Sequence, residues 1–210
     1  MPLCCTLFHV ATFFSMELPL YKLTINEESE GVDFVALTDR PAIERNFQAF
    51  NKQFKFTETA KRVLSGPLML ADTPVYRNDS KLGEYMVMFD KDTIYKIAQK
   101  FFKNGAQKSV NIEHDEPVQG VYLFESFIID RERGVMPPKG YEDVTNGSWF
   151  GSYKVDNDDI WNNRQNFKGF SVEGVFGMER MEAAVEVELV KLEKAVQNFL
   201  QTFQPFNISK

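Results

Sequence analysis

The chain has few of the residues that usually carry metal, redox or nucleic-acid chemistry. Its 210 residues include only two cysteines and two histidines. Cys4 and Cys5 are adjacent, so they supply neither a spaced disulfide framework nor a zinc-binding spacing. No basic block occurs and the net charge is -6, which argues against a nucleic-acid partner. No run reaches the roughly 18 apolar residues of a membrane-spanning helix, so we expect no membrane partner either.

The sequence does contain enough apolar residues for one sizeable core, because 43% of it is hydrophobic. We divide it into four segments. Residues 1–15 are an apolar leader without a basic start, interpreted as non-native or disordered. Residues 16–56 are expected to form a β hairpin or arm with a linker, and residues 57–178 the main domain. Residues 179–210 are expected to form an amphipathic helix and tail, which packs on the sheet or pairs two copies of the chain.

Short alternating segments between turns predict strands, and longer periodic segments predict helices. The clearest helix is expected between Asp90 and Asn104, and a short one between Thr57 and Gly66. Further helical segments are expected at 158–161 and 179–203. Strands without regular strand–helix alternation favour an α+β fold, with an antiparallel or mixed sheet that could close into a small barrel. The predicted strands cover residues 21–25, 32–37, 67–70, 74–76, 84–89, 109–112, 120–129, 149–155 and 168–177.

The segment Lys168–Gly177 places a serine beside a glutamate. Side chains of a strand alternate between its two faces, so Phe170 and Val172 can enter a core while Ser171 and Glu173 share the other face. Alone, this pattern is also that of an ordinary strand with a solvent-facing glutamate.

His114 is the only histidine after the leader, and it lies among acids in Asn111–Pro117. It could be a surface histidine in a turn, a metal ligand with neighbouring carboxylates, or the base of a nucleophilic hydrolase. Zinc is disfavoured because no second histidine or cysteine is available, whereas a magnesium site of carboxylates stays open. Spacing alone does not choose between these roles.

Several motifs occur in the order found in tailed-phage prohead proteases of the XkdF type, and Val32–Ile43 resembles the opening of such proteins. The resemblance implies a serine endopeptidase without cofactor or metal. It would act in the host cytoplasm, inside the procapsid, on scaffold and major capsid proteins and on itself. It also implies a distant relation to herpesvirus assembly proteases, which are small β-barrels with surrounding helices. The motifs are Ala71–Arg77, Asn111–Asp115, Glu125–Ile129, Gly147–Phe150 and Lys168–Gly174.

Carried over to this sequence, the resemblance implies that Ser171 is the nucleophile and His114 the base. Herpesvirus-type enzymes use a second histidine, which this chain lacks outside the leader, so we expect a carboxylate as third member or a simple dyad. Glu173 is the first choice because it lies beside Ser171, and Glu125 is the second. Asp115 is expected to point away from His114.

Two other functions stay open at this stage. The chain could be a non-catalytic virion structural protein on the same scaffold. It could also be a metal-dependent nuclease or phosphoesterase that uses the acids near His114. A homodimer formed through residues 179–203 is a further hypothesis.

Overall fold

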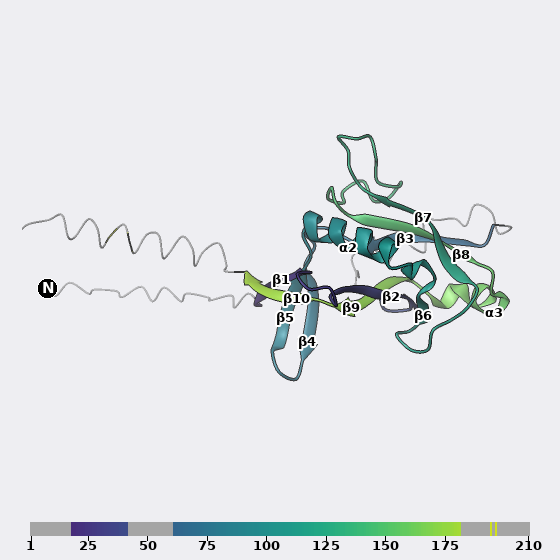
Figure 1. Ribbon diagram of the computed structural model, residues 1–210, viewed down its shortest axis with the longest axis horizontal. Coiled ribbons are helices and arrows are strands. Elements are labelled where there is room, and N and C mark those ends of the chain that lie inside the picture. Colours follow the sequence, from purple (N-terminus) through teal and green to yellow (C-terminus); the bar gives the residue numbers. More distant parts are fainter. Residues whose placement is uncertain (1–17, 42–60, 182–193, 195, 197–210) are drawn as a thin grey trace, which may run out of the picture.

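A computed structural model describes residues 18–41, 61–181, 194 and 196 (Figure 1). The described part holds ten strands in three sheets and two α-helices, so the predicted α+β class is confirmed. The leader 1–15 and most of the predicted helix 179–203 lie outside the described residues. No described helix is both long and apolar enough to cross a membrane.

The three sheets are named here by their strand order. Sheet A is β10-β1-β5-β4, sheet B is β6-β2-β9 and sheet C is β3-β8-β7. Sheet A contains β1 (Leu20–Thr24), β4 (Val75–Asp79), β5 (Gly83–Met88) and β10 (Gly177–Met181). Sheet B contains β2 (Gly31–Thr38), β6 (Val110–Ile112) and β9 (Gly169–Val175). Sheet C contains β3 (Val63–Met69), β7 (Val121–Ile128) and β8 (Trp149–Val155).

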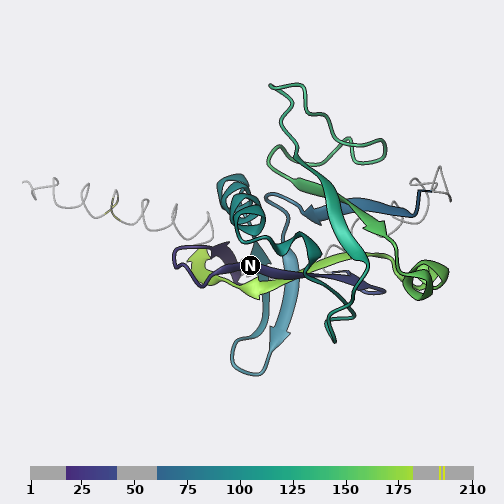
Figure 2. The ribbon, with the colours of Figure 1, turned by 45° about the vertical axis from the view of Figure 1, so that its right-hand side comes forward.

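The ladders among the described residues join strands only within each sheet, so no closed barrel is found and the predicted barrel is not confirmed. The α-helices are α2 (Lys91–Lys103) and α3 (Asp158–Asn162), and both were predicted. Figures 1 and 2 show α2 beside sheet B and the β4–β5 hairpin projecting from the body of the protein.

Three local predictions were wrong. The segments β1 and β2 do not form a hairpin, because β1 pairs with β5 and β10 while β2 pairs with β6 and β9. Residues 63–66 belong to β3 and not to a short helix. Pro67 lies at a bulge of this edge strand, where a missing N–H group is tolerated. Residues 179–181 belong to β10, since pairing with β1 outweighs the helix-like spacing of Met178 and Met181.

The main core lies between sheets B and C and is covered by α2. Val35, Leu37 and Phe170 of sheet B are buried there, together with Trp149 and Tyr153 of sheet C. The apolar face of α2 contributes Ile94, Ile97, Ala98 and Phe101. One face of β2 and β9 is therefore fixed by hydrophobic burial, and the opposite face is left for polar residues.

Gly174 allows β9 to approach β2 closely. A Cβ atom at this position would lie 1.8 Å from the Gly31 carbonyl oxygen and 2.9 Å from the Val32 Cα atom. The β2–β9 register shifts between Val32 and Phe34, next to this contact. A side chain at 174 would therefore push the two strands apart.

We predict that Gly174→Ala lowers the free energy of unfolding by about 1–3 kcal/mol, the usual cost of overpacking. Val175→Ala is the matched control, because Val175 is exposed and its truncation should change stability by less than about 0.5 kcal/mol. Urea unfolding of both variants measures the difference. Equal stabilities would show that β2 can move away from β9 at little cost.

Asp90 begins α2 and joins it to sheet A. Its carboxylate accepts a hydrogen bond of 2.7 Å from the Thr93 backbone N–H and forms an ion pair with Lys22 of β1. Burial alone would raise the pKa of Asp90, but the hydrogen bonds from Lys22 and Thr93 outweigh burial and lower it to about 2.

We predict that Asp90→Ala costs about 1–2 kcal/mol of unfolding free energy near pH 7. Asp90→Asn keeps the capping oxygen and should cost less. Because the folded-state pKa is lowered, the charge stabilises the fold above about pH 4, and this contribution is lost as the pH falls toward 2. Denaturant unfolding of wild type and Asp90→Asn should therefore converge over that range. A constant difference would exclude the Lys22 ion pair as its source.

Candidate active site

The candidate site lies on the polar face of sheet B. Ala36 of β2 is opposite Asn111 of β6 on one side and Ser171 of β9 on the other. Opposite residues of paired strands share a face, as do residues two apart on one strand. Asn111, Ser171 and Glu173 therefore lie on the same face, away from Phe170 and Val172, which pack toward the core.

The turn after β6 carries His114. Glu113 and His114 both have left-handed backbones, with φ values of 52° and 62°, which is uncommon outside glycine. The Glu113 carboxylate accepts hydrogen bonds of 2.7 Å from the Thr38 hydroxyl and from the Asp39 backbone N–H. Its own N–H donates to the Leu37 carbonyl oxygen at 3.0 Å. These contacts to β2 hold the turn in this conformation.

His114 and Glu173 are in direct contact. The distance from His114 Nδ1 to Glu173 Oε1 is 2.6 Å, and the two side chains are 41% and 32% exposed. A carboxylate can only accept a hydrogen bond, so Nδ1 carries the proton in this pair. In the neutral ring, the lone pair is then on Nε2, which can act as a base toward a hydroxyl.

Asn111 is a second donor to the same carboxylate. Its Nδ2 atom lies 2.6 Å from Glu173 Oε1, so Glu173 receives hydrogen bonds from two side chains. Asn111 is only 3% exposed, and its Oδ1 atom is buried without a partner in the described part of the protein. Because the Glu173 carboxylate accepts a hydrogen bond, the Asn111 atom that faces it is the amide nitrogen and not the amide oxygen. This role of Asn111 was not predictable from local patterns, because Asn111 reaches Glu173 across β2.

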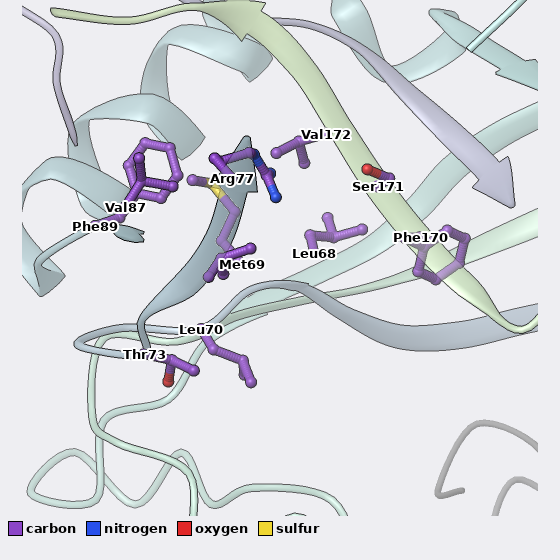
Figure 3. Close-up of a pocket in the computed structure, with 11 residues that line it drawn as sticks. Leu68, Met69, Leu70, Thr73, Arg77, Val87, Phe89, Phe170, Ser171 and Val172 are labelled. Carbon is purple, nitrogen blue, oxygen red and sulfur yellow. The ribbon is translucent and has the colours of Figure 1, made fainter. Parts of the chain in front are cut away.

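Ser171 is two residues before Glu173 and is 6% exposed. It borders a pocket at the free edge of β9, drawn in Figure 3, which extends toward the side of the strand that carries Phe170 and Val172. Its hydroxyl makes no hydrogen bond to His114 within the described ranges. Catalytic hydrogen bonds are often long in unliganded enzymes and tighten when substrate binds, so this leaves both proposed roles open to test.

The other predicted acids are not part of this arrangement. The Glu125 carboxylate accepts a hydrogen bond of 2.7 Å from the Ser152 hydroxyl in sheet C and does not contact His114. Asp115 is exposed, and no hydrogen bond or ion pair joins its side chain to His114 among residues 18–41 and 61–181. In the same residues, no three His, Cys, Asp or Glu side chains gather as a metal site would require.

The protein is therefore an α+β protein in which a serine and a carboxylate lie on one sheet beside a histidine in an adjoining turn, the residue types that serine hydrolases use. A family model titled "Putative phage serine protease XkdF" matches residues 67–182, more than half of the chain. The chain belongs to this phage serine protease family, and the predicted family is confirmed. No curated protein and no solved structure matches the chain.

The matched region contains β6, β9 and all three predicted catalytic residues. The match begins at Pro67 and therefore omits β2, although β2 is the strand that joins β6 to β9. The candidate site thus combines strands that precede and strands that follow residues 42–60 in the sequence.

We predict that neutral His114 is protonated at Nδ1, and that Glu173→Gln weakens this preference because an amide can turn its NH₂ group toward the ring. The ¹⁵N chemical shifts of the imidazole ring distinguish the two tautomers. His9→Gln identifies the signal of the only other histidine. A ring protonated at Nε2 in the wild type, unchanged by Glu173→Gln, would contradict the observed pairing.

Proposed function

We propose that this protein is a serine endopeptidase in which Ser171 is the nucleophile, His114 the general base and Glu173 the residue that orients His114. The observation that carries the proposal is the 2.6 Å contact between His114 Nδ1 and Glu173 Oε1, beside Ser171 on the same face of sheet B. Membership of the phage serine protease family supports it independently.

The proposed reaction follows from the tautomer of His114. Glu173 keeps the proton on Nδ1, so Nε2 accepts the proton of the Ser171 hydroxyl as the oxygen attacks a peptide carbonyl carbon. The protonated ring then gives that proton to the leaving amine, and an acyl-enzyme forms. Water, deprotonated by the same nitrogen, hydrolyses the ester and restores Ser171. Substrate binding must bring Ser171 Oγ and His114 Nε2 to within about 2.6–3.2 Å.

Asn111 has a supporting role in this proposal. Its amide donates a hydrogen bond to Glu173 from β6, and together with His114 it holds the carboxylate in one orientation. Glu113 supports the site in a different way, because it fixes the turn that carries His114.

The proposed substrates are the scaffold and major capsid proteins of a phage, cut inside the immature procapsid in the host cytoplasm. Family membership supports a phage protease, and the substrate follows from the resemblance to prohead proteases. Self-cleavage is part of the same proposal, as is a homodimer formed through residues 179–203. Most of that segment lies outside the described residues.

We predict that wild-type protein co-expressed with the scaffold and capsid proteins of its phage shortens at least one of them. Ser171→Ala and His114→Ala should each lower the cleavage rate by at least about 1000-fold. Glu173→Gln should lower it roughly 100- to 10,000-fold, because the ring loses its fixed tautomer. Gel electrophoresis and intact mass spectrometry follow the products.

Ser80→Ala is the matched control, because Ser80 is an exposed serine in the β4–β5 turn and should behave as wild type. Intact substrates with wild-type enzyme, in particles that still assemble normally, would favour a non-catalytic virion protein. Cleavage that resists Ser171→Ala but is abolished by a chelator would contradict the serine mechanism and favour a metal-dependent enzyme.

A further inference from the structure

The pocket that Ser171 borders has a mostly apolar lining, in which Thr73 and Ser171 supply hydroxyl groups and Arg77 the one charge. It lies between β9, β3 and the β4–β5 hairpin, and its volume is about 50 Å³. That is enough for a few water molecules or a short polar side-chain end. Most of its lining is aliphatic or aromatic, and Arg77 of β4 is its one charged residue (Figure 3). The apolar lining residues are Leu68, Met69, Leu70, Val75, Val87, Phe89, Phe170 and Val172.

Arg77 has no carboxylate partner within the described part of the chain. One guanidinium nitrogen, Nη1, donates to the carbonyl oxygen of the adjacent Tyr76 at 2.9 Å. Arginine has five N–H donors, so most of its hydrogen-bonding capacity is unused. Figure 3 shows the guanidinium turned toward Val172 and Leu68, with Ser171 next along β9. Arg77 as a whole is an exposed residue of the hairpin, and partial burial of its guanidinium lowers its pKa.

Asp79, the acid on the same strand as Arg77, already accepts hydrogen bonds from other groups. Asp79 is two residues further on β4 and therefore on the same face. Its carboxylate accepts hydrogen bonds from the backbone N–H groups of Lys81 at 2.7 Å and Leu82 at 2.8 Å. With the Tyr85 side chain, these bonds lower the pKa of Asp79 and hold it in the turn.

A guanidinium at the wall of a mostly apolar pocket, with unused N–H donors and no counter-ion among the described residues, favours an incoming carboxylate. An arginine–carboxylate pair forms two parallel hydrogen bonds, so Arg77 would select a ligand by its planar shape as well as by its charge. A neutral amide of the same size would leave part of the guanidinium unpaired.

Resting on the proposed function, we infer that Arg77 is a specificity residue that binds an aspartate or glutamate side chain next to the scissile peptide bond of the substrate. The apolar lining receives the methylene groups of that side chain, and Arg77 receives its carboxylate. The preferred substrates are therefore peptides with an acidic residue beside the cleaved bond.

The test compares peptides that differ only by Glu or Gln at each position within three residues of the cleaved bond. A synthetic peptide library first locates the cleavage site of the wild type, and kcat/KM is then measured for each pair. At one position, wild type should prefer Glu over Gln by about 10- to 100-fold. Arg77→Leu should remove this preference, and Arg77→Lys should keep part of it. Arg77→Glu should favour Lys at the same position.

Arg133→Leu is the matched control, because Arg133 is an exposed arginine in a loop and should leave the Glu preference unchanged. A second measurement does not depend on catalysis. Fluorescence anisotropy of the same Glu and Gln peptides on Ser171→Ala should show the same preference, and it should be lost in the Ser171→Ala, Arg77→Leu double variant.

Two results would overturn the inference. An equal loss of kcat for Glu and Gln peptides in Arg77→Leu would mean that Arg77 serves the reaction itself and not side-chain recognition. A wild type that cleaves peptides with no acidic preference would exclude the subsite while leaving the protease proposal intact. Conversely, acid-selective binding without cleavage by the wild type would retain the subsite and reject the protease.

Discussion

The alternation of side chains along β9 is the constraint on which the rest of the site depends. Phe170 is buried in the main core, and Val172 packs against it, so the strand cannot rotate without losing apolar contacts. Ser171 and Glu173 must then face the other way. A slip of one residue against β2 would exchange the two faces and place both polar side chains in the core. Hydrophobic burial on one side of sheet B therefore positions the proposed catalytic serine and glutamate on the other.

The polar face is held by hydrogen bonds that cross sheet B. Glu173 receives the amide of Asn111 and the ring of His114, and Glu113 fastens the His114 turn to Thr38 and Asp39. The two glutamates thus have different roles, because Glu173 contacts the His114 ring and Glu113 holds the backbone of the turn that carries it. The left-handed conformation of His114 is maintained by this second set of contacts.

Local patterns predicted the elements whose signals are local. The α2 helix was predicted from its period and its Asp90 cap, and β9 from strict alternation that also placed Glu173 beside Ser171. Long-range pairing was not predictable in the same way. The supposed β1–β2 hairpin is instead two strands of different sheets, and β10 replaces the first residues of a predicted helix because β1 lies beside it.

The same limit explains which site residues were missed. Asn111 reaches Glu173 only because β2 separates β6 from β9, and that strand order has no signature in any single segment. Arg77 belongs to sheet A, almost a hundred residues from Ser171 in sequence, and meets its pocket through the packing of the β4–β5 hairpin. Family resemblance predicted Ser171 and His114, and strand alternation predicted Glu173, whereas Asn111 and Arg77 were found only in the structure.

Covalent labelling with a fluorophosphonate, located by peptide mass spectrometry, tests the central claim most directly. The probe reacts with serine hydroxyls that a neighbouring base activates, and it needs no knowledge of the substrate. The account predicts a single adduct on Ser171. Labelling should be abolished by His114→Ala and slowed by Glu173→Gln. No adduct on Ser171, or an adduct that forms equally fast without His114, would contradict it.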